Sequence, residues 1–117
     1  MSAESTLYSI LSTAAGVTAL VSTRIYPDLV PEEKSTPYIG YERVGSDPIS
    51  TLHGTTLGHI ARLVVACWAD TRLAAEGLAD AVEVALSGSD FSITARGAEM
   101  DEATNRLATT LDIEILA

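Results

Sequence analysis

The stretch Gly58–Gly88, GHIARLVVACWADTRLAAEGLADAVEVALSG, predicts one long strand that leads directly into one amphipathic helix. Its first half, Ile60–Trp68, is rich in β-branched, apolar and aromatic residues, which favour a mostly buried strand. The pattern changes at Ala69–Thr71, and the apolar residues that follow recur at helical spacing. We therefore expect a strand and a helix that pack on one another, with the other elements completing the sheet.

The helical half of this stretch has one apolar face. Asp70 or Thr71 is the expected N-cap, because a side-chain oxygen there can accept a hydrogen bond from a first-turn N–H group. Gly88 is expected to end the helix in a left-handed conformation. The residues assigned to the apolar face are Ala74, Leu78, Ala81, Val82, Ala85 and Leu86. This face must be buried, and the preceding strand is the nearest surface that can cover it.

The remaining elements predict a sheet with helices on one side. Ala3–Ala15 has the spacing of a short amphipathic helix, and Val17–Val21 adds a further helical turn. The other strands are expected at Tyr38–Val44, Phe91–Glu99 and Arg106–Leu116. The predicted order is α-(α)-β-β-α-β-β, a single α+β domain over residues 1–117 with a mainly antiparallel four-stranded sheet and helices packed on one face.

Between the first two predicted strands, residues 45–57 (GSDPISTLHGTTL) predict a long, flexible hairpin loop. Pro48 and Gly54 are expected to interrupt any strand ladder, and a loop of this length without structure of its own is often functional. The candidate assembly loop consists of Asp47, Pro48, Ile49, Ser50, Thr51, Leu52, His53, Gly54, Thr55 and Thr56.

Composition and charge narrow the possible functions. The chain has 117 residues, 47% of them hydrophobic, which is enough for one core. No apolar run approaches the ~20 residues that span a bilayer. The formal net charge of −9 repels nucleic acid phosphates, so we expect no specific nucleic-acid binding. Two explanations of the negative charge remain open. It can keep the protein soluble, or it can line a channel through which DNA passes without binding.

The residue types that carry catalysis do not form a recognisable motif. His53 and His59 lie six positions apart with no Cys or carboxylate spacing typical of a metal site around them. Cys67, the single cysteine, is expected to be a small buried hydrophobe in its strand. We expect no cofactor, no metal and no enzyme activity. The alternative from another class is a small α+β enzyme or ligand-binding domain with a site near His53, His59 and Asp47.

Four further residues are candidates for an interface. Glu76, Asp80 and Glu83 fall at i, i+4 and i+7, which predicts an acidic stripe that faces solvent or a partner. A cation site is less favoured, because oxygen ligands on one rigid helix face rarely enclose an ion. Trp68 is expected either to pack at the core or sheet edge or to anchor an interface, where aromatic residues are enriched.

The chain resembles the small tail completion, or tail terminator, proteins of long-tailed bacteriophages. The resemblance covers nearly the whole sequence and rests on the order and spacing of four segments. These are LYSILSTAAGVTALVSTRIYP at Leu7–Pro27, TPYIGYERVGSDP at Thr36–Pro48, STLHGTT at Ser50–Thr56 and ARLVVACWADTRLAAEGLADAVEVAL at Ala61–Leu86.

This resemblance implies a structural virion protein that is assembled in the host bacterial cytoplasm. Proteins of this family are similar to terminators that form a hexameric ring, cap the tail tube and join it to the head connector. The implied partners are other copies of the chain, the tail tube protein and a head–tail connector or adaptor. DNA would pass through the lumen, and no membrane is involved. A head-side adaptor between portal and tail is the alternative within virion assembly.

Overall fold

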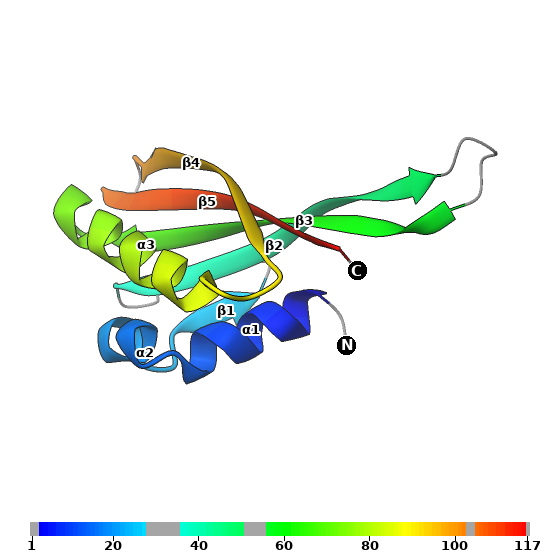
Figure 1. Cartoon of the computed structure of the whole chain (residues 1–117). Coiled ribbons are helices and arrows are strands. Elements are labelled where there is room, and N and C mark those ends of the chain that lie inside the picture. The colour runs from blue at the N-terminus through cyan, green and yellow to red at the C-terminus, as the bar shows by residue number, and fades with distance from the viewer. Residues whose placement is uncertain (1–2, 28–35, 51–55, 103–104, 117) are drawn as a thin grey trace.

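The sheet and helices predicted from the sequence are present in the computed structural model, which describes residues 3–27, 36–50, 56–102 and 105–116 (Figure 1). The helices are α1 (Ala3–Thr13), α2 (Ala15–Val21) and α3 (Arg72–Leu86), and the strands are β1 (Ile25–Pro27), β2 (Tyr38–Ser50), β3 (Thr56–Ala69), β4 (Ser92–Asp101) and β5 (Arg106–Leu116). The strands form one sheet in the order β1-β2-β3-β5-β4, in which only β1 and β2 run parallel. The α+β class and the single domain are confirmed.

The ends of α3 follow from two local signals. Thr71 is the N-cap, and its Oγ1 accepts a hydrogen bond from the backbone N of Ala74 at 3.1 Å. Asp70, the other expected cap, instead accepts a hydrogen bond from Thr36 at 2.7 Å. Gly88 has a φ of +81°, so the left-handed residue expected after the helix is confirmed.

The core lies between the three helices and one face of the sheet. From α3 it takes Ala75, Leu78, Ala79, Val82 and Leu86, all buried. From β3 and β5 it takes Leu63, Val65, Cys67, Leu111 and Ile113. The predicted helix face is therefore correct at Leu78, Val82 and Leu86. At Ala74 it is wrong, because Ala75 occupies the buried position one residue later.

The fifth strand, β1, was not predicted as a strand. It is a three-residue edge strand that pairs parallel to β2, with Ile25 opposite Ile39. So short a segment cannot show the alternation by which strands are recognised. The sequence predicts it only as extended chain before Pro27.

The predicted loop at residues 45–57 is corrected. β2 continues to Ser50 and β3 begins at Thr56, so most of this segment is a two-stranded ladder in which Pro48 lies opposite His59. Proline is tolerated there because an edge strand does not need every N–H donor. Half of the candidate assembly loop lies outside the described residues, namely Thr51, Leu52, His53, Gly54 and Thr55.

The extended hairpin makes the molecule long. Figure 1 shows β2 and β3 projecting together beyond the rest of the sheet. The longest dimension is 50 Å, and the radius of gyration is 15.0 Å. A compact domain of this length has a radius of gyration of about 13 Å. The excess is consistent with an arm that lies outside the core.

Leu78→Asp tests the packing of α3. Leu78 is 1% exposed, so the substitution places an unpaired charge in the core and is expected to cost several kcal/mol of unfolding free energy or to prevent folding. Val84→Asp is the matched control on the same helix. Val84 is 75% exposed, and its substitution is expected to change stability by about 0.5 kcal/mol or less. Urea unfolding followed by circular dichroism measures both, and equal stabilities would contradict this facing of the helix.

Candidate functional site

The projecting part of the hairpin, residues 45–50 of β2 and 56–60 of β3, is called the ribbon below. Neither neighbouring strand extends along it beyond Ile60. β1 pairs with β2 only as far as Tyr41, and the last pair between β5 and β3 joins Leu116 to Ile60. Beyond these points the described residues of the ribbon pair only with each other. Its two outer edges therefore carry backbone groups that no strand of this chain satisfies.

The base of the ribbon is held by two arginines. A β-bulge lies between Arg43 and Gly45, and bulges bend a strand and increase its twist. Arg62 lies across Gly45, where an added Cβ would come within 3.1 Å of Arg62 Nη2. Its Nε is 3.2 Å from Asp47 Oδ2. A larger residue at position 45 would require the half-exposed guanidinium of Arg62 to shift by a few tenths of an ångström.

The second arginine ties the same region to a helix. Arg43 Nη2 is 2.6 Å from Glu4 Oε1 of α1, and Arg43 Nη1 donates to Ser46 Oγ at 3.0 Å. Each pair is partly exposed, so each contributes little to stability alone. Both contacts lie beside the bulge, where the ribbon leaves the fold.

The two edges of the ribbon differ in what they can pair with. Pro48 has no N–H, so it removes one donor from β2 and protects that edge against another strand. Among the residues of β3 in the ribbon, Thr56–Ile60, none is proline. The β3 edge is therefore the one better suited to accept a strand from another molecule.

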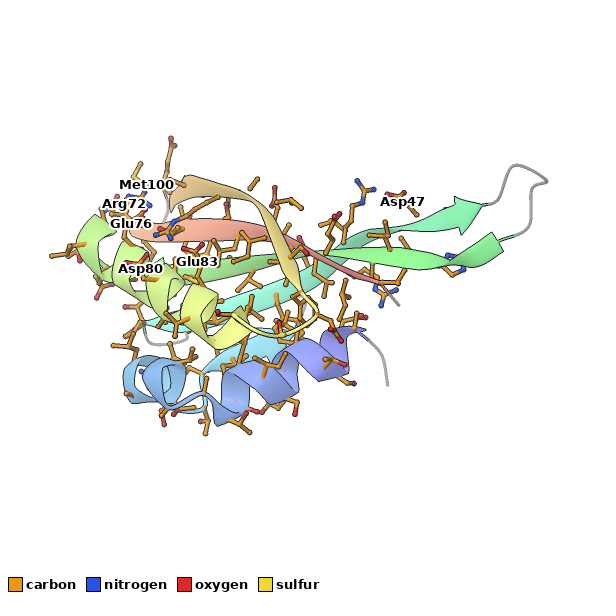
Figure 2. All side chains as sticks on the ribbon, in the orientation of Figure 1. Asp47, Arg72, Glu76, Asp80, Glu83 and Met100 are labelled. Carbon is orange, nitrogen blue, oxygen red and sulfur yellow. The ribbon has the colours of Figure 1, made fainter. Side chains whose placement is uncertain are left out.

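The predicted acidic stripe forms a cluster around Arg96 of β4. Arg96 Nη2 lies 2.5 Å from Glu76 Oε2, and Nη1 lies 3.0 Å from Asp80 Oδ1 and also contacts Glu83. Figure 2 shows the three carboxylates on α3 beside β4. Thr109, a buried side chain of β5, donates to Glu76 Oε1 at 2.9 Å. The stripe expected to face solvent or a partner is thus engaged within the chain, although Asp80 remains 69% exposed.

Charge pairing in this cluster shifts the pKa of two groups. The hydrogen bond from Arg96, followed by that from Thr109, lowers the pKa of Glu76 from its ordinary value of 4.5. The hydrogen bond to Glu76 in turn raises the pKa of Arg96. The guanidinium occupies the space between the carboxylates, so the cluster holds β4 against α3. Among the described residues no group of His, Cys, Asp or Glu is arranged to hold a metal ion.

Trp68 lies on the face of the sheet opposite the helices, called the open face below. The centroids of the Trp68 and Tyr38 rings are 6.3 Å apart. The Arg106 guanidinium lies over the Tyr38 ring, 5.6 Å from its centroid. Beside them is a cavity of about 280 Å³, to which Glu42 and Glu99 contribute. Sequence reasoning singled out Trp68 but missed its companions. The alternation of Tyr38, Gly40 and Glu42 along β2 was the available signal.

The residues of the alternative site do not come together. His59 lies exposed on the ribbon, and His53 is outside the described residues. Neither His59 nor Asp47 lines either of the two cavities found on the open face. Burial raises the pKa of the Cys67 thiol to about 12, as expected for an unreactive core residue. No helix in the described part of the chain has the length and apolar character needed to cross a membrane.

Comparison with known proteins agrees with this picture of a structural domain. Residues 5–115 match the family model described as tail completion protein gp17. No curated protein matches the chain. A chain of the solved structure titled "Virion of native gene transfer agent (GTA) particle" matches with a TM-score of 0.73 and 22% sequence identity, over 94% of this chain and 90% of the other. This likeness shows a shared fold.

Glu76→Gln tests the cluster through its pH dependence. The folded state holds the pKa of Glu76 below 4.5, so the ionised carboxylate adds stability that is present above that value and is lost as the pH falls through the lowered pKa. The variant is expected to melt at a lower temperature than the wild type at pH 7. This difference is expected to shrink steadily below pH 4.5.

Glu99→Gln is the control, because Glu99 lies on the same strand as Arg96 and its carboxylate makes no ion pair with any described residue. Its melting temperature is expected to follow the wild type across the pH range. If the difference in melting temperature between Glu76→Gln and the wild type stays constant from neutral to acid pH, the role given to the cluster is contradicted. Thermal melts followed by circular dichroism supply both comparisons.

Proposed function

The chain belongs to the tail completion protein gp17 family, and we propose that it caps the tail tube as one subunit of a hexameric ring and joins the tube to the head connector. Family membership makes it a structural protein of a phage-type virion. The solved chain of similar fold comes from a gene transfer agent virion, which supports the same setting. A head-side adaptor is less well supported, because such adaptors are more often helical bundles.

The ribbon is the observation that carries this proposal. A two-stranded hairpin without a covering layer is marginally stable in water. Here it extends past β1 and β5 and has no helix over it (Figure 1). A surface on another molecule can cover it after assembly. An arm of this kind suits a ring, in which one patch of each subunit contacts a different patch of the next and the rotation closes the circle.

The opposite edge of the sheet offers a second, different patch. β4 is the last strand in the sheet order, it has ten residues and none of them is proline. The Arg96 cluster holds this strand against α3. In the proposed ring, the β3 edge of one ribbon pairs with the β4 edge of the next subunit. The outer surface of α3, including Asp80, is a further candidate contact, and Trp68, Glu76 and Glu83 keep their predicted interface role as a hypothesis.

The excess of acidic residues suits a conduit for DNA. With 16 acidic and seven basic residues, a lumen lined by such subunits repels phosphates and lets the duplex pass without binding. No contact specific to nucleic acid is part of the proposal. The partners are copies of this chain, the tube protein and the connector.

Removal of the ribbon tip separates folding from assembly. Deleting residues 48–56 joins Asp47 to Leu57 and leaves Leu57–His59 as a three-residue connection between the paired residues Asp47 and Ile60. Because these residues supply nothing to the core, the variant is expected to melt within a few degrees of the wild type. It is expected to lose the ability to cap tubes.

The measurement uses the full chain together with a tail tube protein from the same virion. Negative-stain electron microscopy and native mass spectrometry are expected to show tubes of defined length that end in six copies of the wild-type chain. Tubes formed with the deletion variant are expected to be uncapped and of variable length. If the deletion variant also caps tubes, the ribbon is not needed for capping. If the wild-type chain leaves tube length unchanged, the proposed function is contradicted.

A further inference from the structure

The cavity on the open face is built as a binding pocket for a side chain. It has a volume of about 280 Å³, and residues of β2, β3, β4 and β5 line it. Five of these residues carry the argument: Tyr38, Gly40, Glu42, Trp68 and Glu99. No helix lies over this face of the sheet (Figure 1). The cavity is therefore open to a partner without any rearrangement of the fold.

The floor of the cavity is aromatic and aliphatic. The rings of Tyr38 and Trp68 lie 6.3 Å apart with an angle of 31° between their planes. Val64 and Ala66 lie beside them on β3, and Gly40 has no side chain that would fill the space. A surface of this kind accepts an alkyl chain, and the ring of Trp68 can attract a cation, whereas the ring of Tyr38 already has the Arg106 guanidinium over it.

Two of the carboxylates that line the cavity have no ion-pair partner among the described residues. Glu42 comes from β2 and Glu99 from β4, and neither carboxylate forms an ion pair with the residues that the structure describes. The carboxylates of Glu76 and Glu83 differ, since both form an ion pair with Arg96. Unpaired carboxylates beside an apolar floor select a positive group on an alkyl stem, which is the chemistry of lysine and arginine.

We propose that this pocket receives a lysine or arginine side chain of a protein other than this chain. A second copy is a poor donor of arginine, because the described arginines already have partners, and the single lysine, Lys34, lies outside the described residues. Arg43 and Arg62 pair with Glu4 and Asp47, and Arg96 with the α3 carboxylates.

The other three arginines are equally engaged. Arg24 and Arg72 donate to the carbonyl oxygens of Pro37 and Ala108 at 2.9 Å each, and Arg106 lies over Tyr38. A second copy would have to break one of these contacts in order to place a described arginine in the pocket. The inference rests on the pocket alone and does not require that the chain form a ring.

Short peptides test the pocket on the free, full-length chain. The probes are Ac-Gly-Arg-Gly-NH₂ and Ac-Gly-Lys-Gly-NH₂, and the neutral control replaces arginine with citrulline. Trp68 is the single tryptophan, so its fluorescence reports directly on the pocket. A saturable change is expected with both basic peptides and not with the citrulline peptide. Binding is expected to weaken about tenfold in the double variant Glu42→Gln/Glu99→Gln.

Glu114→Gln is the matched control, because Glu114 lies on the same sheet but outside the lining of the cavity. It is expected to bind the peptides as the wild type does, and matching thermal melts show that all variants are folded. An equal response to the citrulline peptide, unchanged affinity in the double variant, or no saturable response to either basic peptide would overturn the proposal. Sedimentation supplies one more test. If the free chain self-associates and the double variant does not, the pocket binds a second copy, and the proposal is overturned.

Discussion

Burial of one stripe of α3 against one face of the sheet is the contact on which the rest of the structure depends. Leu78, Val82 and Leu86 supply that stripe, and β3 and β5 supply the surface beneath it. All three helices gather on this side (Figure 1), because only there does the sheet offer a continuous apolar surface. The open face and the ribbon lie outside this core. The surfaces available to partners are therefore those that the core does not use.

Charge pairing within the chain shapes these free surfaces. The chain has few basic residues, and its described arginines serve internal contacts at the base of the ribbon, on α3 and β4, and above Tyr38. Each exposed pair contributes little to stability, but together they orient the ribbon and hold β4 in place. The remaining surface is left acidic.

Much of the fold could be predicted from the sequence, and the failures have physical reasons. The alternation of Arg106–Leu116 and the cap at Thr71 are local signals, and both are confirmed. Pro48 is typical of a loop, but it stands in an edge strand where a missing donor costs little. The contact between Glu76 and Arg96 joins residues 20 positions apart, and no helical spacing reveals it. The pocket beside Trp68 likewise arises only when four strands are brought side by side.

The geometry of the ribbon also sets how its reach can change in evolution. Each residue added to a strand lengthens it by about 3.3 Å, so one residue in each strand moves the tip outward by that amount. Such a step also turns every later side chain to the other face, because the period of a strand is two. Lengthening that keeps the faces therefore comes in increments of about 6.6 Å. Since the described side chains of the ribbon lie outside the core, the reach of the ribbon can change in these discrete steps while the domain itself is unchanged.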